Sequence, residues 1–189
     1  MPQLRVGAEE VQRWRTAAGV DTGVAVALAP GSVGGSKRWT YYPEAARLLA
    51  EQGLDVWVIG GPGEKAIARE IVSASGPGPR VRDLTGTDLR YGILAMAAAS
   101  LAISNDSGLM HIAAALGTPT IGIFGPTSPY HWAPLNGLAA TVQTKTAVPC
   151  QPCHRPVCRM NDHRCMRDIP AADVVEIAEH VLREAARSP

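Results

Sequence analysis

The sequence predicts an α/β fold in which a doubly wound parallel sheet of about six strands is covered by helices on both faces, as in Rossmann-like domains. Apolar runs of four to six residues alternate with stretches of about ten residues that read as helices. Strands that are apolar throughout are buried on both faces, which is typical of parallel sheets. Regular alternation of strand and helix indicates right-handed crossovers between parallel strands.

The first half of the chain supplies three strand–helix pairs. A short amphipathic helix, residues 9–18, ends at Gly19, and the first strand, residues 24–29, stops at Pro30-Gly31. A helix over residues 43–52 precedes the second strand, residues 54–59, which the Gly-Pro-rich residues 60–63 close. The pattern then predicts a helix over residues 64–75, a short strand over 81–84 and a helix to residue 98 that Asp88 can cap.

The second half continues the alternation. A fourth strand is expected over residues 100–104 and its helix over 107–116, after which Gly117-Thr118-Pro119 turns the chain into a fifth strand, residues 120–124. A sixth strand is expected over residues 139–143, and an amphipathic helix over 172–186 ends the fold. We therefore divide the chain into a linker with a helix (1–22), a Rossmann-like domain (23–149), a Cys-rich loop (150–168) and a C-terminal helix that packs on the domain (169–189).

Composition excludes several function classes. Of the 189 residues, 46% are hydrophobic and 19% are charged, which is enough apolar side chain for a sizeable core. A formal net charge of +1 argues against a nucleic-acid-binding face. No apolar run approaches the roughly 18 residues of a membrane span, and the polar N-terminus has no signal-peptide core. We expect a cytoplasmic protein without a transmembrane segment.

Polar and glycine-rich loops follow the predicted strands, at the edge where doubly wound sheets bind ligands. The helix that begins near Ser107 would offer free backbone N–H groups to a phosphate, with Asn105, Asp106 and Gly108 beside it and His111 one turn further on. A plain helix cap by Asp106 or Ser107 is the alternative. The other loops follow the first, second and fifth strands and contribute Ser32, Lys37, Arg38, Gly61, Glu64 and Thr127.

Four of these loop residues can be interpreted either as ligand contacts or as ordinary structural residues. Lys37 and Arg38 could neutralise a diphosphate or be two solvated charges. Glu64 could accept hydrogen bonds from ribose hydroxyls or complement the dipole of its own helix. Thr127 could donate to a sugar or phosphate or only shape a turn. The loops match neither the GxxxxGK[ST] nor the GxGxxG pattern, so NAD binding has little support.

Four cysteines lie in one short segment, PCQPCHRPVCRMNDHRC. A CxxC start is typical of structural zinc sites, but the second pair of cysteines is spread too widely for the usual two-knuckle spacing. Structural zinc, reduced thiols packed in a loop and disulfides remain open, and a cytoplasmic setting disfavours the last of these. The four residues concerned are Cys150, Cys153, Cys158 and Cys165.

The sequence resembles glycosyltransferase family 9, the bacterial heptosyltransferases of lipopolysaccharide core synthesis, and within it the heptosyltransferase II-like members. The resemblance is carried by APGSVGGSKRW, VWVIGGPGE, SNDSGLMHIAAALGTPTIGIFGPTSP and CRMNDHRCMRDI, and it extends over residues 2–182. Thr40 departs from the usual KRWP. The resemblance implies one half of a two-domain GT-B enzyme, in which Lys37, Asp106, Ser107 and Gly108 meet the diphosphate and heptose of ADP-heptose. The resemblance also implies that His111 corresponds to the histidine of the family motif that contains Asp106, Ser107 and Gly108. It implies, more weakly, that Glu64 contacts the ribose of the donor.

The resemblance further implies what this chain lacks. Family members are roughly twice as long, and their first half holds the acceptor site and the general base, for which no residue here is convincing. We therefore expect a donor-binding half that needs no cofactor, is inactive alone, and reaches the lipid A–Kdo acceptor only through the missing domain, with peripheral association at the inner face of the inner membrane. The alternatives are another sugar-nucleotide glycosyltransferase or epimerase domain, and a non-catalytic nucleotide- or metal-binding module.

Overall fold

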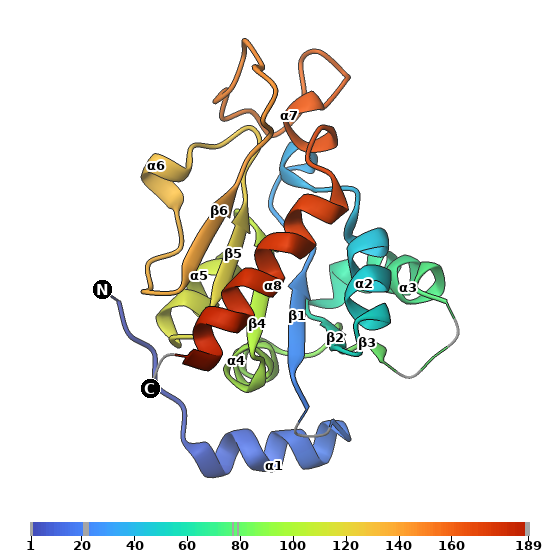
Figure 1. Ribbon diagram of the computed structural model, residues 1–189, viewed down its shortest axis with the longest axis vertical. Coiled ribbons are helices and arrows are strands. Elements are labelled where there is room, and N and C mark those ends of the chain that lie inside the picture. Colours follow the sequence, from blue (N-terminus) through green and yellow to red (C-terminus); the bar gives the residue numbers. More distant parts are fainter. Residues whose placement is uncertain (1, 21–22, 77, 79, 188–189) are drawn as a thin grey trace.

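The computed structural model describes residues 2–20, 23–76, 78 and 80–187. Six parallel strands form one sheet in the order β3-β2-β1-β4-β5-β6 (Figure 1). The strands are β1 (Ala25–Ala29), β2 (Asp55–Val58), β3 (Val81–Asp83), β4 (Leu101–Asn105), β5 (Thr120–Ile123) and β6 (Ala139–Val142). This is the strand order of a dinucleotide-binding Rossmann sheet, in which the direction of winding reverses between β1 and β4. The predicted fold class is confirmed.

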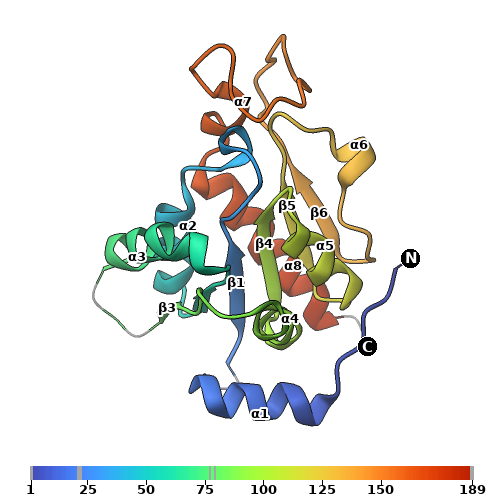
Figure 2. The same cartoon turned by 180° about the vertical axis from the view of Figure 1, so that it is seen from behind.

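Helices cover both faces of this sheet. The α-helices are α1 (Ala8–Ala18), α2 (Tyr42–Glu51), α3 (Lys65–Ala74), α4 (Leu89–Ala98), α5 (Gly108–Ala115), α6 (Pro129–Trp132), α7 (Arg164–Arg167) and α8 (Ala171–Arg187), and two 3₁₀ turns are η1 (Gly35–Lys37) and η2 (Pro62–Glu64). Helices α2 and α8 lie against one face, in front of the sheet in Figure 1. Helices α4 and α5 lie on the other face, which Figure 2 turns toward the reader.

The alternation of side chains in β1 explains the two layers. Val26 and Leu28 belong to the apolar cluster shared with α2 and α8. Ala25, Ala27 and Ala29 point the opposite way, into the cluster shared with α1 and α4. All five residues are completely buried, as expected for a central parallel strand. The alanine face lets α4 pack close to the sheet.

The predicted strands and the predicted helices agree with the structure to within one residue at each end. Asp88 caps α4 as predicted, because its carboxylate accepts a hydrogen bond from the backbone N–H of Tyr91. The short helices η1, η2, α6 and α7 were not predicted, since three or four residues carry no helical periodicity. The predicted linker 1–22 and C-terminal segment 169–189 include residues 1, 21, 22, 188 and 189, which lie outside the described residues.

Loops at the carboxyl ends of the strands and the loops at their amino ends lie on opposite sides of the molecule. The Cys-rich loop, η1 and α7 gather at the carboxyl side, at the top of Figure 1, and α1 lies at the opposite side. No helix among the described residues is long and apolar enough to cross a membrane.

Candidate functional site

A cavity of about 720 Å³ opens at the carboxyl ends of β1, β2, β4 and β5. It is lined by the loops that follow these four strands, by the start of α4 and by the Cys-rich loop, which supports the expectation that the strand-end loops converge. The lining residues are Gly31, Ser32, Val33, Lys37, Gly60, Gly61, Glu64, Leu89, Asp106, Ser107, Gly108, Leu109, His111, Ile112, Thr127, Trp132 and His154.

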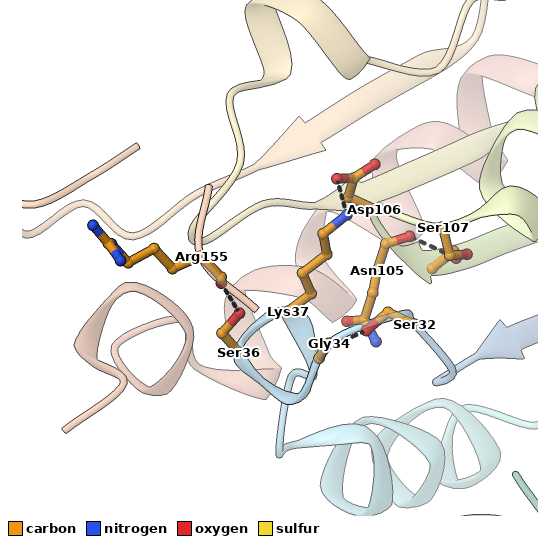
Figure 3. A network of polar contacts seen from close by, with 9 residues as sticks. Ser32, Gly34, Ser36, Lys37, Asn105, Asp106, Ser107 and Arg155 are labelled. Carbon is orange, nitrogen blue, oxygen red and sulfur yellow. Dashed lines mark hydrogen bonds and ion pairs between the residues drawn. The ribbon is translucent and has the colours of Figure 1, made fainter. Parts of the chain in front are cut away.

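An ion pair joins the two loops at the point where the sheet reverses its winding. The Lys37 ammonium, from the loop after β1, lies 2.8 Å from the Asp106 carboxylate, from the loop after β4 (Figure 3). The Asp106 side chain is only 8% exposed and that of Lys37 is 27% exposed. An ammonium has three donors, so Lys37 can hold Asp106 and still reach oxygen atoms in the cavity.

The amino end of α5 opens into the same cavity. Ser107 is the N-cap residue of α5, but its side chain makes no capping hydrogen bond; instead its hydroxyl lies 3.0 Å from that of Ser104. The backbone N–H groups of the first turn are therefore not occupied by a cap and carry the positive end of the helix dipole. Gly108 adds no side chain that would keep a ligand from them.

The loop that carries Lys37 is fixed from two sides. The buried amide of Asn105 accepts a hydrogen bond from the Trp39 N–H (3.2 Å) and donates one to the Pro30 carbonyl (2.7 Å). The hydroxyl of Ser36 donates to the carbonyl of Arg155 in the Cys-rich loop, a contact that Figure 3 shows beside Lys37. The Lys37 ammonium is thus held over the sheet by both ends of its loop.

Glu64 occupies the β2 end of the cavity in a space that two glycines leave free. Its Oε2 accepts a hydrogen bond from the Gly61 N–H at 2.9 Å. A Cβ at Gly31 would lie 2.8 Å from Glu64 Oε1, and a Cβ at Gly60 would lie 2.8 Å from Glu64 Cβ. Both interpretations of Glu64 fit this geometry, since it is the N-cap residue of α3 and also lines the cavity.

At the β5 end of the cavity, a buried hydroxyl lacks a partner. Thr127 is 6% exposed, and its Oγ1 has no hydrogen-bond partner among the described residues. Burying an unpaired hydroxyl is costly, so such groups are expected where a ligand supplies the missing partner. Trp132, half exposed on α6, and His154, from the Cys-rich loop, line the same end.

Nine of the eleven predicted site residues line the cavity, and two do not. Arg38 is exposed beyond its rim, and Asn105 is fully buried with both ends of its amide bonded to the backbone. Asn105 therefore supports the Lys37 loop, and direct ligand contact by these two residues has no geometric support. The other nine are Ser32, Lys37, Gly61, Glu64, Asp106, Ser107, Gly108, His111 and Thr127, whose contact with a ligand stays a prediction.

Leu89, Trp132 and His154 are among the lining residues that the sequence did not predict. Leu89 and Trp132 are large apolar residues that stay exposed, 64% and 50% respectively. Exposed apolar side chains at the rim of a cavity are informative in a structure, but the sequence does not separate them from residues of the core. His154 lies within the Cys-rich segment, where the spacing of the cysteines suggests a metal and gives no sign of a ligand contact by the histidine.

The four cysteines are free thiols in the structure. Burial raises the pKa of Cys165 to about 11, and the three neighbouring thiols add to this shift. Slight burial would also raise the pKa of Cys158, but backbone N–H groups, first that of His163, outweigh it and lower the pKa. Among the described residues no group of three or more His, Cys, Asp or Glu side chains could hold a metal ion. The zinc alternative is not supported.

The pKa values of Tyr42 and Asp83, which lie outside the cavity, are also shifted. Burial raises the pKa of Tyr42, whose hydroxyl donates to the Ala29 carbonyl at the end of β1. Partial burial would raise the pKa of Asp83 as well, but hydrogen bonds from Thr85 and from the Lys65 ammonium outweigh burial and lower it. Asp83 thereby fixes the turn after β3, next to the cavity.

Comparison with known proteins gives a consistent relationship. The model of "Glycosyltransferase family 9 (heptosyltransferase)" matches residues 1–163. Lipopolysaccharide heptosyltransferase 2 of Escherichia coli is 34% identical over 127 residues, which are 64% of this chain and 36% of that protein. Lipooligosaccharide heptosyltransferase 2 of Campylobacter jejuni is 33% identical over 165 residues, 84% of this chain and 51% of that protein.

The solved structure of ADP-heptose lps heptosyltransferase II from E. coli superposes with a TM-score of 0.83 and 28% identity. The superposition covers 98% of this chain and 54% of that one. The chain thus spans about half the length, or less, of the relatives that it matches.

Proposed function

Because the chain belongs to glycosyltransferase family 9, we propose that it is the donor-binding half of a heptosyltransferase and that the strand-end cavity binds ADP-heptose. The observation that carries the proposal is the Lys37–Asp106 ion pair, 2.8 Å long, beside the uncapped amino end of α5. We infer the identity of the donor from a similar protein of known structure, the E. coli ADP-heptose heptosyltransferase.

The proposed chemistry follows from the charges in the cavity. When the glycosidic bond of the donor breaks, negative charge grows on the leaving diphosphate. The Lys37 ammonium and the N–H groups that begin α5 stabilise this charge, because they are fixed before the reaction begins. Asp106 keeps Lys37 extended over the cavity, and Glu64 accepts hydrogen bonds from the ribose hydroxyls.

Transfer also requires a base at the acceptor hydroxyl. Asp106 and Glu64 are the two carboxylates among the described lining residues, and both are engaged, one by Lys37 and the other by the Gly61 N–H. We therefore propose that a second domain supplies the base and the site for the lipopolysaccharide inner core, and that this chain alone binds the donor without transferring heptose. A lipid-anchored acceptor of this kind would be met at the cytoplasmic face of the inner membrane.

Calorimetric titration of the 189-residue chain tests the proposal. ADP should bind more tightly than UDP, because the donor is an adenosine diphosphate sugar. Tighter binding of UDP would favour another sugar-nucleotide enzyme, and absence of nucleotide binding would contradict the proposal. Heptose transfer to a lipid A–Kdo acceptor by this chain alone would contradict the assignment of the base to a second domain.

A further inference from the structure

The strand order of the sheet fixes the order of the candidate ligand-binding residues along the cavity. Along the strand order, Glu64 follows β2, Lys37 follows β1, Asp106 follows β4 and Thr127 follows β5. If the proposed function holds, Glu64 meets the ribose, and the diphosphate lies at Lys37 and the start of α5. The group beyond the diphosphate then falls at the end of the cavity that Thr127 lines, which is the place of the transferred sugar.

That end is formed by groups suited to a sugar. The Thr127 hydroxyl is buried and unpaired among the described residues, so it can donate to or accept from a sugar hydroxyl. Trp132 offers a half-exposed ring, and an amphipathic aromatic side chain packs well against the apolar face of a pyranose. A site with a few placed polar groups on an apolar wall fixes the orientation of a small ligand.

His154 completes this end from a segment outside the sheet. Its N–H and that of Cys153 both donate to the Pro126 carbonyl, at 2.8 and 3.0 Å, directly before Thr127. His154 is exposed and lines the cavity. Its backbone is left-handed, with φ 53°, a conformation that residues other than glycine adopt rarely and that recurs at ligand sites.

The same loop also contacts the loop that carries Lys37. Ser36 donates its backbone N–H to the Pro156 carbonyl at 3.2 Å and its hydroxyl to the Arg155 carbonyl. Gly34, with φ 92°, lies so close to this segment that a Cβ there would be 3.1 Å from the Pro156 Cα. Residues 153–156 therefore bridge the diphosphate end and the β5 end of the cavity.

We infer that the Cys-rich loop is part of the donor site, and that His154 hydrogen-bonds the transferred sugar together with Thr127. The inference rests on the proposed function, because it needs a nucleoside diphosphate sugar in the cavity. It gives the loop a role that does not depend on a metal: the loop holds one imidazole over the sugar end and fixes the position of Lys37 through Ser36.

Paired titrations of the full chain with ADP and with ADP-heptose test this inference. His154→Gly is the informative variant, because glycine adopts φ near 53° freely and the substitution removes only the imidazole. We expect its affinity for ADP-heptose to fall at least about fivefold while its affinity for ADP changes less than about twofold, as expected for the loss of one hydrogen bond. Thr127→Val should show the same selective loss.

His163→Gly is the matched control. His163 belongs to the same loop and has φ 50°, but it does not line the cavity, so both affinities should stay unchanged. Equal loss of both ligands in His154→Gly, or no loss of either, would overturn the sugar contact. If the wild type binds ADP and ADP-heptose with the same affinity, the proposed contacts to the sugar are refuted, but the proposed nucleotide site is not. A wild type that binds neither ligand would refute the proposed function and, with it, this inference.

Discussion

Substitution of Asn105 by alanine should separate the support of the Lys37 loop from ligand contact. The Asn105 side chain is completely buried, and its amide bonds the Trp39 N–H at 3.2 Å and the Pro30 carbonyl at 2.7 Å. Asn105→Ala leaves both backbone groups buried without a partner. Each such group costs about 1–3 kcal/mol, so the free energy of unfolding should fall by about 2–6 kcal/mol.

This loss can be measured by urea unfolding followed by tryptophan fluorescence. A domain is stable by about 5–15 kcal/mol, so ADP binding is measured under conditions in which the unfolding curve shows the variant to be folded. Its affinity for ADP should fall about tenfold, because both ends of the loop that presents Lys37 lose their anchor. A loss of stability below about 1 kcal/mol would refute the assigned role of the amide.

Asn136→Ala is the matched control, because it removes an amide that also bonds two backbone groups but lies away from the cavity. Asn136 donates to the Thr118 carbonyl at 2.7 Å and accepts from the Leu138 N–H at 3.0 Å, at the opposite edge of the sheet. The variant should lose stability as well but keep its affinity for ADP. If both variants lose affinity equally, Asn105 has no particular connection with the cavity.

Three further predictions concern other parts of the molecule. Near neutral pH, iodoacetamide should alkylate Cys158, whose pKa is lowered, before Cys165, whose pKa burial raises to about 11, because the thiolate is the reactive form; peptide mass spectrometry showing the reverse order would contradict this. The folded pKa of Asp83 is lowered, so its contribution to stability is present above the unfolded pKa and lost as pH falls through the folded pKa. Asp83→Asn should therefore lose less stability than the wild type between about pH 5 and about pH 3, and equal losses in urea unfolding would argue against it. In Gly125→Ala the new Cβ would overlap a methionine sulfur of α7, which should lower the free energy of unfolding by about 1–3 kcal/mol, whereas Gly137→Ala, with nothing within 4 Å, should change it by less than about 0.5 kcal/mol.

The fold could be predicted because its determinants are local in sequence. The strands are mostly apolar runs, such as residues 25–29, and the longer helices have either apolar periodicity or a recognisable start, such as Asp88. The pairing of β1 with β4 also follows from general rules, since doubly wound sheets reverse their winding once. The short helices η1, η2, α6 and α7 are too short to leave such a pattern.

Site residues could be predicted where a sequence motif lies directly after a predicted strand. They could not be predicted where contacts between distant parts of the chain determine the position of the residue. Lys37 and Asp106 were expected at the same edge of the sheet because each lies in a loop that follows a predicted strand, and the structure brings them to 2.8 Å. Asn105 directly precedes Asp106 in the sequence, but it is the last residue of β4, a strand whose five residues are all buried. The position of His154 depends on hydrogen bonds to Pro126, 28 positions earlier in the chain, and no pattern within the loop announces them.

The binding of ADP to Lys37→Ala tests the central claim most directly. Removal of the ammonium deletes a charge-assisted contact to the diphosphate, worth about 1.5–3 kcal/mol, and leaves the Asp106 carboxylate to repel the ligand. Calorimetry should therefore show affinity lower by about 10- to 100-fold. Lys65→Ala, which removes an ammonium paired with Asp83 at 3.2 Å outside the cavity, should leave the affinity within about twofold. Unchanged affinity in Lys37→Ala would contradict the account.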